Sequence, residues 1–121
     1  MTRFISCIRT CLILLLCFAL APPGAFAESS INWEEVSERT KRALYKAQQY
    51  MNDAAFEEAI EHLERFAERY PKHNHFLIEF NIGTCYGFLN DQKNAIAHLE
   101  KAAGLNAEYS PIWLNLGKLY Y

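Results

Sequence analysis

The sequence predicts an all-α protein built from repeated antiparallel helix pairs, and three observations lead to that prediction. Apolar residues recur at helical spacing after residue 27, a pattern typical of helices that bury one face. Capping and turn residues divide this part of the chain into five segments of helical length. The hexapeptide at 59–64 returns at 95–100 with five of six residues identical, at a spacing of 36 residues, which indicates internal repetition.

Residues 1–27 are predicted to be a secretory signal peptide. Arg3 and Arg9 give a positive start, and residues 11–21 form an uninterrupted apolar run. Proline and glycine then break any helix, and small residues precede the cleavage that we expect after Ala27. The alternative is an uncleaved membrane anchor, but the run is shorter than the about 20 residues that a spanning helix needs.

The remaining domain, residues 28–121, is mildly acidic. It keeps all fourteen acidic and ten of the twelve basic residues, for a formal charge of −4. Because no basic cluster is present, we do not expect a nucleic acid partner. Cys85 is the one cysteine outside the predicted signal, so an intrachain disulfide is not expected in this domain. We interpret Cys85 as a small apolar residue packed between helices.

The first helix is predicted to begin at Asn32 and to end near Asn52. Asn32 is a favourable N-cap, and Glu35 completes a capping box three residues later. Ile31 and Val36 can form the apolar contact that often accompanies such a box.

The second helix is predicted at 55–69, because Pro71 cannot continue it and disfavours helix in the preceding residue. A polar connector at 72–75 leads to a third helix at 76–88.

The fourth helix is predicted at 92–103. Asn90-Asp91 provides a turn and an N-cap before it, and Gly104 stands at the favoured position after it. Ser110-Pro111 opens a fifth helix, with proline in its first turn.

A second match supports the repeat, because Ile82-Gly83 and Tyr86 return as Leu116-Gly117 and Tyr120 at a spacing of 34 residues. These residues resemble the tetratricopeptide repeat, a 34-residue helix–turn–helix unit. The resemblance implies units at approximately 40–75 and 76–109 and a half unit at 110–121. By the family's pattern, the residues that pack within and between helix pairs are Ala47, Tyr50, Ala59, Leu63, Pro71, Gly83, Tyr86, Ala95, Leu99, Ala102, Trp113, Leu116, Gly117 and Tyr120.

Some positions depart from the family's pattern. Ala43 and Glu79 stand where tryptophan is expected, and Ala107 replaces the terminal proline of one unit. Small residues such as Gly83 and Ala95 permit close approach of two helices. Because each pair is apolar on both sides, pairs must stack. The resemblance implies a short right-handed α-solenoid with a concave side lined by the first helix of each pair.

The resemblance also implies a groove that binds a segment of another protein. Its lining is expected to be Leu44, Gln48, Met51, Leu77, Phe80, Thr84, Phe88, Leu114 and Lys118. A mixed apolar groove of this kind suits an amphipathic helix or an extended peptide with apolar anchors. The alternative is that the apolar members pack within the domain. The carboxylate clamp of some family members is absent, because Asn81 alone matches it.

No enzymatic or metal site is predicted. His62 and His98 occupy the same place in two repeats, and His73 and His75 lie in a connector. No further ligands accompany them, although metal sites generally need three or four. No nucleophile motif or glycine-rich phosphate loop is present, so we expect no catalytic residue, cofactor or small-molecule substrate.

These observations together predict an exported, periplasmic or secreted, non-enzymatic adaptor that binds a protein or peptide partner, with a role in envelope assembly as one expectation. The last helix leads to the alternative. Its apolar residues, among them Trp113, Leu114 and Tyr120, have no following helix to cover them. That feature is also compatible with a truncated repeat array, a structural stub without a separate ligand, or self-association through the C-terminal helix.

Overall fold

The computed structural model describes residues 31–121, so the predicted signal peptide lies outside the described residues. This part of the chain forms five α helices and no strand. The helices are α2 (Glu38–Asn52), α3 (Phe56–Arg69), α4 (Phe76–Phe88), α5 (Gln92–Leu105) and α6 (Ser110–Tyr120), with a short 3-10 helix at Pro71–His73. Among residues 31–121, no helix combines the length and apolar character needed to cross a membrane.

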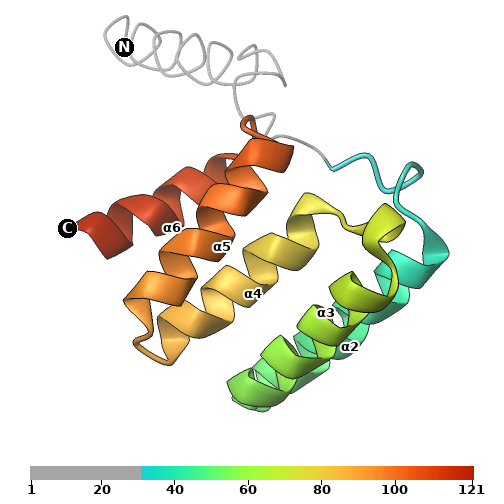
Figure 1. Ribbon diagram of the computed structural model, residues 1–121, viewed down its shortest axis with the longest axis horizontal. Helices are drawn as coiled ribbons and strands as arrows, with labels where there is room; N and C mark the ends of the chain where they lie inside the picture. The colour runs from blue at the N-terminus through green and yellow to red at the C-terminus, as the bar shows by residue number, and fades with distance from the viewer. Residues whose placement is uncertain (1–30) are drawn as a thin grey trace, which may run out of the picture.

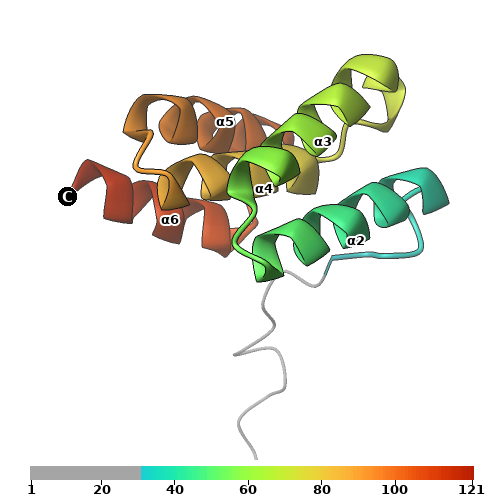
Figure 2. The ribbon, with the colours of Figure 1, turned by 90° about the horizontal axis from the view of Figure 1, so that it is seen from below.

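The helices form antiparallel pairs that pack side by side (Figure 1). Helix α3 contacts both α2 and α4, and α5 contacts both α4 and α6. Viewed from below, α2, α4 and α6 lie toward one side of the molecule, and α3 and α5 lie toward the other (Figure 2). The first helices of successive pairs therefore share one face, as the repeat predicts.

The start of α2 differs from the prediction. Asn32 and Glu35 are hydrogen-bonded at 2.8 Å, but they stabilise a separate turn, and the helix begins only at Glu38. Its N-cap is Ser37, whose hydroxyl accepts a hydrogen bond from the Thr40 backbone N–H at 3.1 Å. The side chain of Thr40 donates to the His73 carbonyl at 3.1 Å. A tertiary contact therefore holds the observed start, and the predicted start at Asn32 is wrong.

The predicted bounds of α3 and α4 are confirmed to within one residue. The prediction for the end of α5 is wrong, because Gly104 is helical and the C-cap is Asn106, whose N–H bonds to the Ala102 carbonyl. The positive φ values among the described residues belong to Ala54 and Asn90, in the turns that follow α2 and α4.

The core consists of two clusters of buried residues, and each cluster joins three consecutive α helices. The first joins α2, α3 and α4 through Ala43, Ala47, Ala59, Ile60, Leu63, Phe66, Ile78, Ile82 and Cys85. The second joins α4, α5 and α6 through Phe76, Leu77, Leu99, Ala102, Ile112 and Leu116. Helix α4 contributes to both clusters, so it is the central element of the domain.

Candidate functional site: a pocket between α4 and α6

The predicted groove residues differ widely in how much of each side chain reaches solvent. Gln48, Leu114 and Lys118 are exposed, and Phe88 is 61 % exposed although its ring stacks on Phe56 with centroids 4.7 Å apart. These side chains are available to a partner.

Four further residues of the predicted groove are half-buried: Leu44, Met51, Phe80 and Thr84. Leu44 packs against both core clusters and so joins α2 to the rest of the domain. The Phe80 ring meets Tyr109 edge-on at 5.4 Å. Leu77 is 5 % exposed and belongs to the second cluster. It is therefore a core residue with almost no surface to offer a partner.

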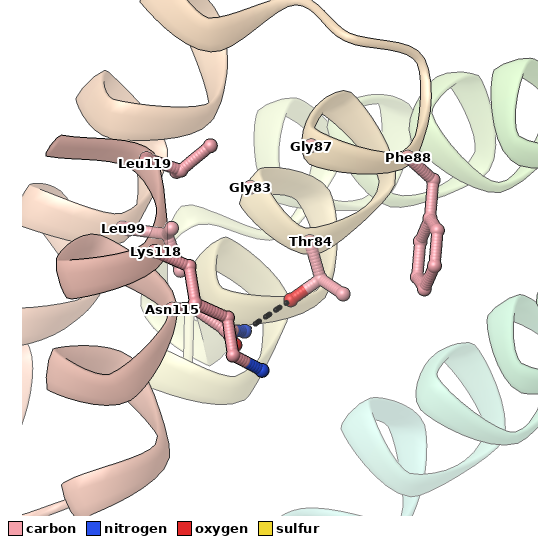
Figure 3. A pocket seen from close by; sticks show the side chains of 8 residues that line it. All are labelled: Gly83, Thr84, Gly87, Phe88, Leu99, Asn115, Lys118 and Leu119. Carbon is pink, nitrogen blue, oxygen red and sulfur yellow. Dashed lines mark hydrogen bonds between the residues drawn. The ribbon is translucent and has the colours of Figure 1, made fainter. Parts of the chain in front are cut away.

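A pocket of about 240 Å³ lies where α4, α5 and α6 meet. Figure 3 shows its lining, with the α6 side chains facing the glycines of α4 and the Phe88 ring at the far side. The lining residues are Gly83, Thr84, Gly87, Phe88, Leu99, Asn115, Lys118 and Leu119. Thr84, Phe88 and Lys118 were predicted for the groove, whereas Gly87, Asn115 and Leu119 were missed.

A hydrogen bond links the two walls of the pocket. The Asn115 side-chain amide donates to the Thr84 hydroxyl at 3.3 Å, and that hydroxyl donates to the Phe80 carbonyl at 2.8 Å (Figure 3). Asn115 lies 34 residues after Asn81, so it holds on α6 the repeat position that Asn81 holds on α4. This spacing could have indicated Asn115.

The two glycines of α4 have different effects on the pocket. A Cβ on Gly83 would lie 2.8 Å from Leu99 Cγ and 3.1 Å from the Ala95 carbonyl oxygen, so this glycine is needed for close packing of α5. A Cβ on Gly87 would meet nothing within 4 Å. Because glycine has no side chain, the backbone of α4 is accessible at this position. The result is a mainly apolar depression beside one ammonium group, that of Lys118. It suits an apolar side chain with a carbonyl or carboxylate nearby.

The residues predicted to pack the repeat fall into two groups. Buried are Ala47, Ala59, Leu63, Gly83, Ala95, Leu99, Ala102 and Leu116, and Tyr50 and Tyr86 are half-buried. Pro71, Trp113 and Tyr120 are exposed, and a Cβ on Gly117 would meet nothing within 4 Å. The packing positions of α6 therefore differ from those of α4.

His62 and His98 make equivalent contacts in the two pairs. A ring nitrogen of His62 lies 3.2 Å from the Ala43 carbonyl oxygen, and one of His98 lies 2.8 Å from a Glu79 carboxylate oxygen. His62 is tilted against Tyr50 and His98 stacks on Tyr86. These contacts explain the recurrence of histidine as packing within a helix pair.

Within residues 31–121, no group of three or more metal-binding side chains converges. The His75 ring accepts a hydrogen bond from the Leu77 N–H at 3.3 Å and so caps α4.

Glu79 is a buried carboxylate that sequence reasoning recorded only as a departure from the family's pattern. It is 1 % exposed and bonds to His98 at 2.8 Å, Lys101 at 2.9 Å and Asn74 at 3.2 Å. Burial raises its pKa, but hydrogen bonds from His98, Lys101 and Asn74 and the charge of Lys101 outweigh burial and lower the pKa to about 2. Burial also raises the pKa of the Cys85 thiol to about 11, so this thiol is protonated at neutral pH.

The structure consists of consecutive helix pairs, with small residues where the helices cross. A comparison with known protein families agrees with this arrangement. The tetratricopeptide repeat family model matches residues 80–109, from within α4 through α5 to the connector before α6. This segment of the chain is a tetratricopeptide repeat. Searches of curated proteins and of solved structures give no match. The matched segment contains Phe80, Gly83, Thr84 and Phe88, so it includes the α4 wall of the pocket.

Proposed function

We propose that this protein is a non-enzymatic adaptor, built from tetratricopeptide-like helix pairs, that binds a peptide or helix of a partner protein across α2, α4 and α6. The tetratricopeptide repeat at residues 80–109 supports a protein–protein interaction module. The proposed solenoid geometry, right-handed with a concave groove, extends the observed order in which each second helix contacts the first helices on both sides.

The pocket between α4 and α6 carries the proposal. It combines an exposed phenylalanine, which is costly to leave in water, with the side-chain amide of Asn115 and the ammonium group of Lys118 in the same lining. A partner segment would insert an apolar side chain beside Phe88 and place a carbonyl or carboxylate near Lys118. This combination of an apolar anchor and a few polar groups is typical of peptide recognition.

Two pocket variants test the proposal. Proteins retained by the wild-type chain from its native extract would be compared with those retained by Phe88→Ala and Lys118→Glu. We expect at least one protein to be lost with both variants, and the affinity of that purified protein to fall by about tenfold or more, a loss typical of residues at the centre of an interface.

The matched controls are Tyr45→Ala, which also removes an exposed aromatic ring, and Lys93→Glu, which also reverses a lysine charge, at exposed positions of α2 and α5 outside the pocket. Both controls should retain the partner. Helicity and the midpoint of urea unfolding would be recorded for every variant. Loss of the partner only in variants that also unfold would contradict the proposal.

We also propose that the protein is exported through residues 1–27 and acts in the periplasm or as a secreted protein, with envelope assembly as the process in which it takes part. The support is the positive start, the apolar run and the small residues before Ala27. The mass of the protein purified from its source should match a chain beginning at Glu28. A mass that includes Met1 would reject cleavage and favour an anchored form.

A further inference from the structure

The pocket between α4 and α6 has a lining that can distinguish one apolar side chain from another. Its walls come from α4, α5 and α6, which contact one another. None of its lining residues is acidic. Phe88 and Lys118 lie on opposite sides of Thr84 (Figure 3). A side chain that enters the pocket therefore has an aromatic ring on one side and a positive charge on the other.

The Phe88 ring can receive a second ring. One of its faces stacks on Phe56 of α3, with ring centroids 4.7 Å apart and an interplanar angle of 11°. Phe88 is nevertheless 61 % exposed, so its other face is open to solvent. Aromatic pairs interact more favourably than their buried area alone accounts for. A ring from a partner would continue the stack that Phe56 begins.

The Lys118 ammonium is the second feature that favours a ring. Among residues 31–121 it makes no ion pair, unlike Lys41 and Lys101. Its side chain extends from α6 toward the α4 side of the pocket (Figure 3). An ammonium group is attracted to the face of an aromatic ring by the negative charge of that face. An aliphatic side chain would displace water from the ammonium and give it no such compensation.

Two other polar groups of the pocket are already hydrogen-bonded. The Thr84 hydroxyl donates to the Phe80 carbonyl at 2.8 Å and accepts from the Asn115 amide at 3.3 Å. The wall at Gly87 has room, because a Cβ there would meet nothing within 4 Å. A flat ring without polar atoms can therefore lie against this wall, and the ammonium is the charged group that it meets.

We propose that the pocket selects an aromatic side chain of the partner segment, held between the open face of Phe88 and the ammonium of Lys118. This inference rests on the proposed function, because it names the anchor residue of the segment that the pocket binds. Lys118 is the specificity-determining residue. Because lysine has three N–H donors, its ammonium can contact the ring and still donate to a carbonyl of the same segment.

Two probes that differ in aromaticity test the selection. N-acetyl-phenylalanine amide and N-acetyl-cyclohexylalanine amide have side chains of similar size, and burial alone would favour the saturated ring. Each would be titrated into the ¹⁵N-labelled protein, with the Kd taken from the shifts of the Gly87 backbone amide and the Asn115 side-chain amide. We expect the phenylalanine probe to bind about twofold to fivefold more tightly, the size of a cation–π interaction at an exposed site.

Lys118→Met tests the origin of the preference. Methionine removes the charge and keeps an apolar chain, so the phenylalanine probe should lose its advantage over the cyclohexylalanine probe. Lys118 is exposed, and the variant should unfold at the same urea concentration as wild type. Lys93→Met, at an exposed position of α5 outside the pocket, is the matched control and should keep the preference.

Three results would overturn the inference. Equal affinities of the two probes at the pocket would reject aromatic selection and leave an apolar anchor, and with it the proposed function, in place. A preference that survives Lys118→Met would reject the role assigned to the ammonium. Absence of saturable shifts at Gly87 and Asn115 would reject the pocket as the aromatic site. The retention experiment with Phe88→Ala and Lys118→Glu decides the proposed function separately.

Discussion

At the scale of single residues, Gly83 and Gly117 hold the same repeat position but lie in opposite surroundings. Gly83 is buried where α4 and α5 cross, and the nearest atoms to a Cβ there include the backbone of α5. Gly117 has open space around the same point of α6. The resemblance to the family predicts one packing role for both, whereas the contacts of each helix decide whether that role is used.

Alanine at the two positions should therefore change stability in opposite directions. Gly83→Ala is expected to lower the free energy of unfolding by about 1–3 kcal/mol, because α5 must shift to admit the methyl group. Gly117→Ala should raise it by up to about 1 kcal/mol, because alanine favours helix over glycine by roughly that amount. Urea unfolding followed by circular dichroism measures both. Changes of the same sign would show that the two surroundings are not distinct.

At the scale of elements, strong local signals predicted the helices well. Helix α4 was predicted at its observed bounds because Pro71 and a polar connector at 72–75 precede it and Asn90-Asp91 follows it. The start of α2 was missed because two adequate caps compete in the sequence, Asn32 and Ser37. The hydrogen bond from the Thr40 side chain to the His73 carbonyl favours Ser37 as the cap. Thr40 and His73 lie 33 residues apart in the chain.

The candidate site was predicted only in part, also for reasons of tertiary contact. The family's pattern indicates which helix face a residue occupies, and three of the residues that it assigns to the groove, Thr84, Phe88 and Lys118, line one pocket. It gives no measure of burial, so Leu77 was assigned to the groove although the second cluster covers it. Asn115 was missed because its role depends on a hydrogen bond between two helices.

At the scale of the whole molecule, the Glu79 carboxylate links α4 to α5 and to the connector that precedes α4. It receives hydrogen bonds from Asn74 in the connector and from Lys101 on α5, and it lies 2.8 Å from His98. His98 also lies 3.8 Å from Glu64 of α3. Breaking one member of a buried ionic group leaves its partners uncompensated, so the stability of the domain should depend on the charge of Glu79.

Acid is expected to weaken the domain through this carboxylate. Its pKa is about 2 in the folded protein against an ordinary value of 4.5, so the folded state holds the proton less tightly than the unfolded state. The stabilising contribution is complete above about pH 4.5 and is lost as the pH falls toward 2, by roughly 3 kcal/mol for a shift of this size. Urea unfolding at pH 6, 4 and 3 measures the loss.

Glu79→Gln tests the origin of this pH dependence. The variant should be less stable than wild type at pH 6, because Lys101 loses its buried partner, and its stability should change less between pH 6 and 3. Glu68→Gln, at an exposed position of α3, is the matched control and should follow the wild-type curve. If Glu79→Gln lost as much stability in acid as wild type, the acid sensitivity would belong to other carboxylates, and Glu79 would contribute to packing without coupling the fold to pH.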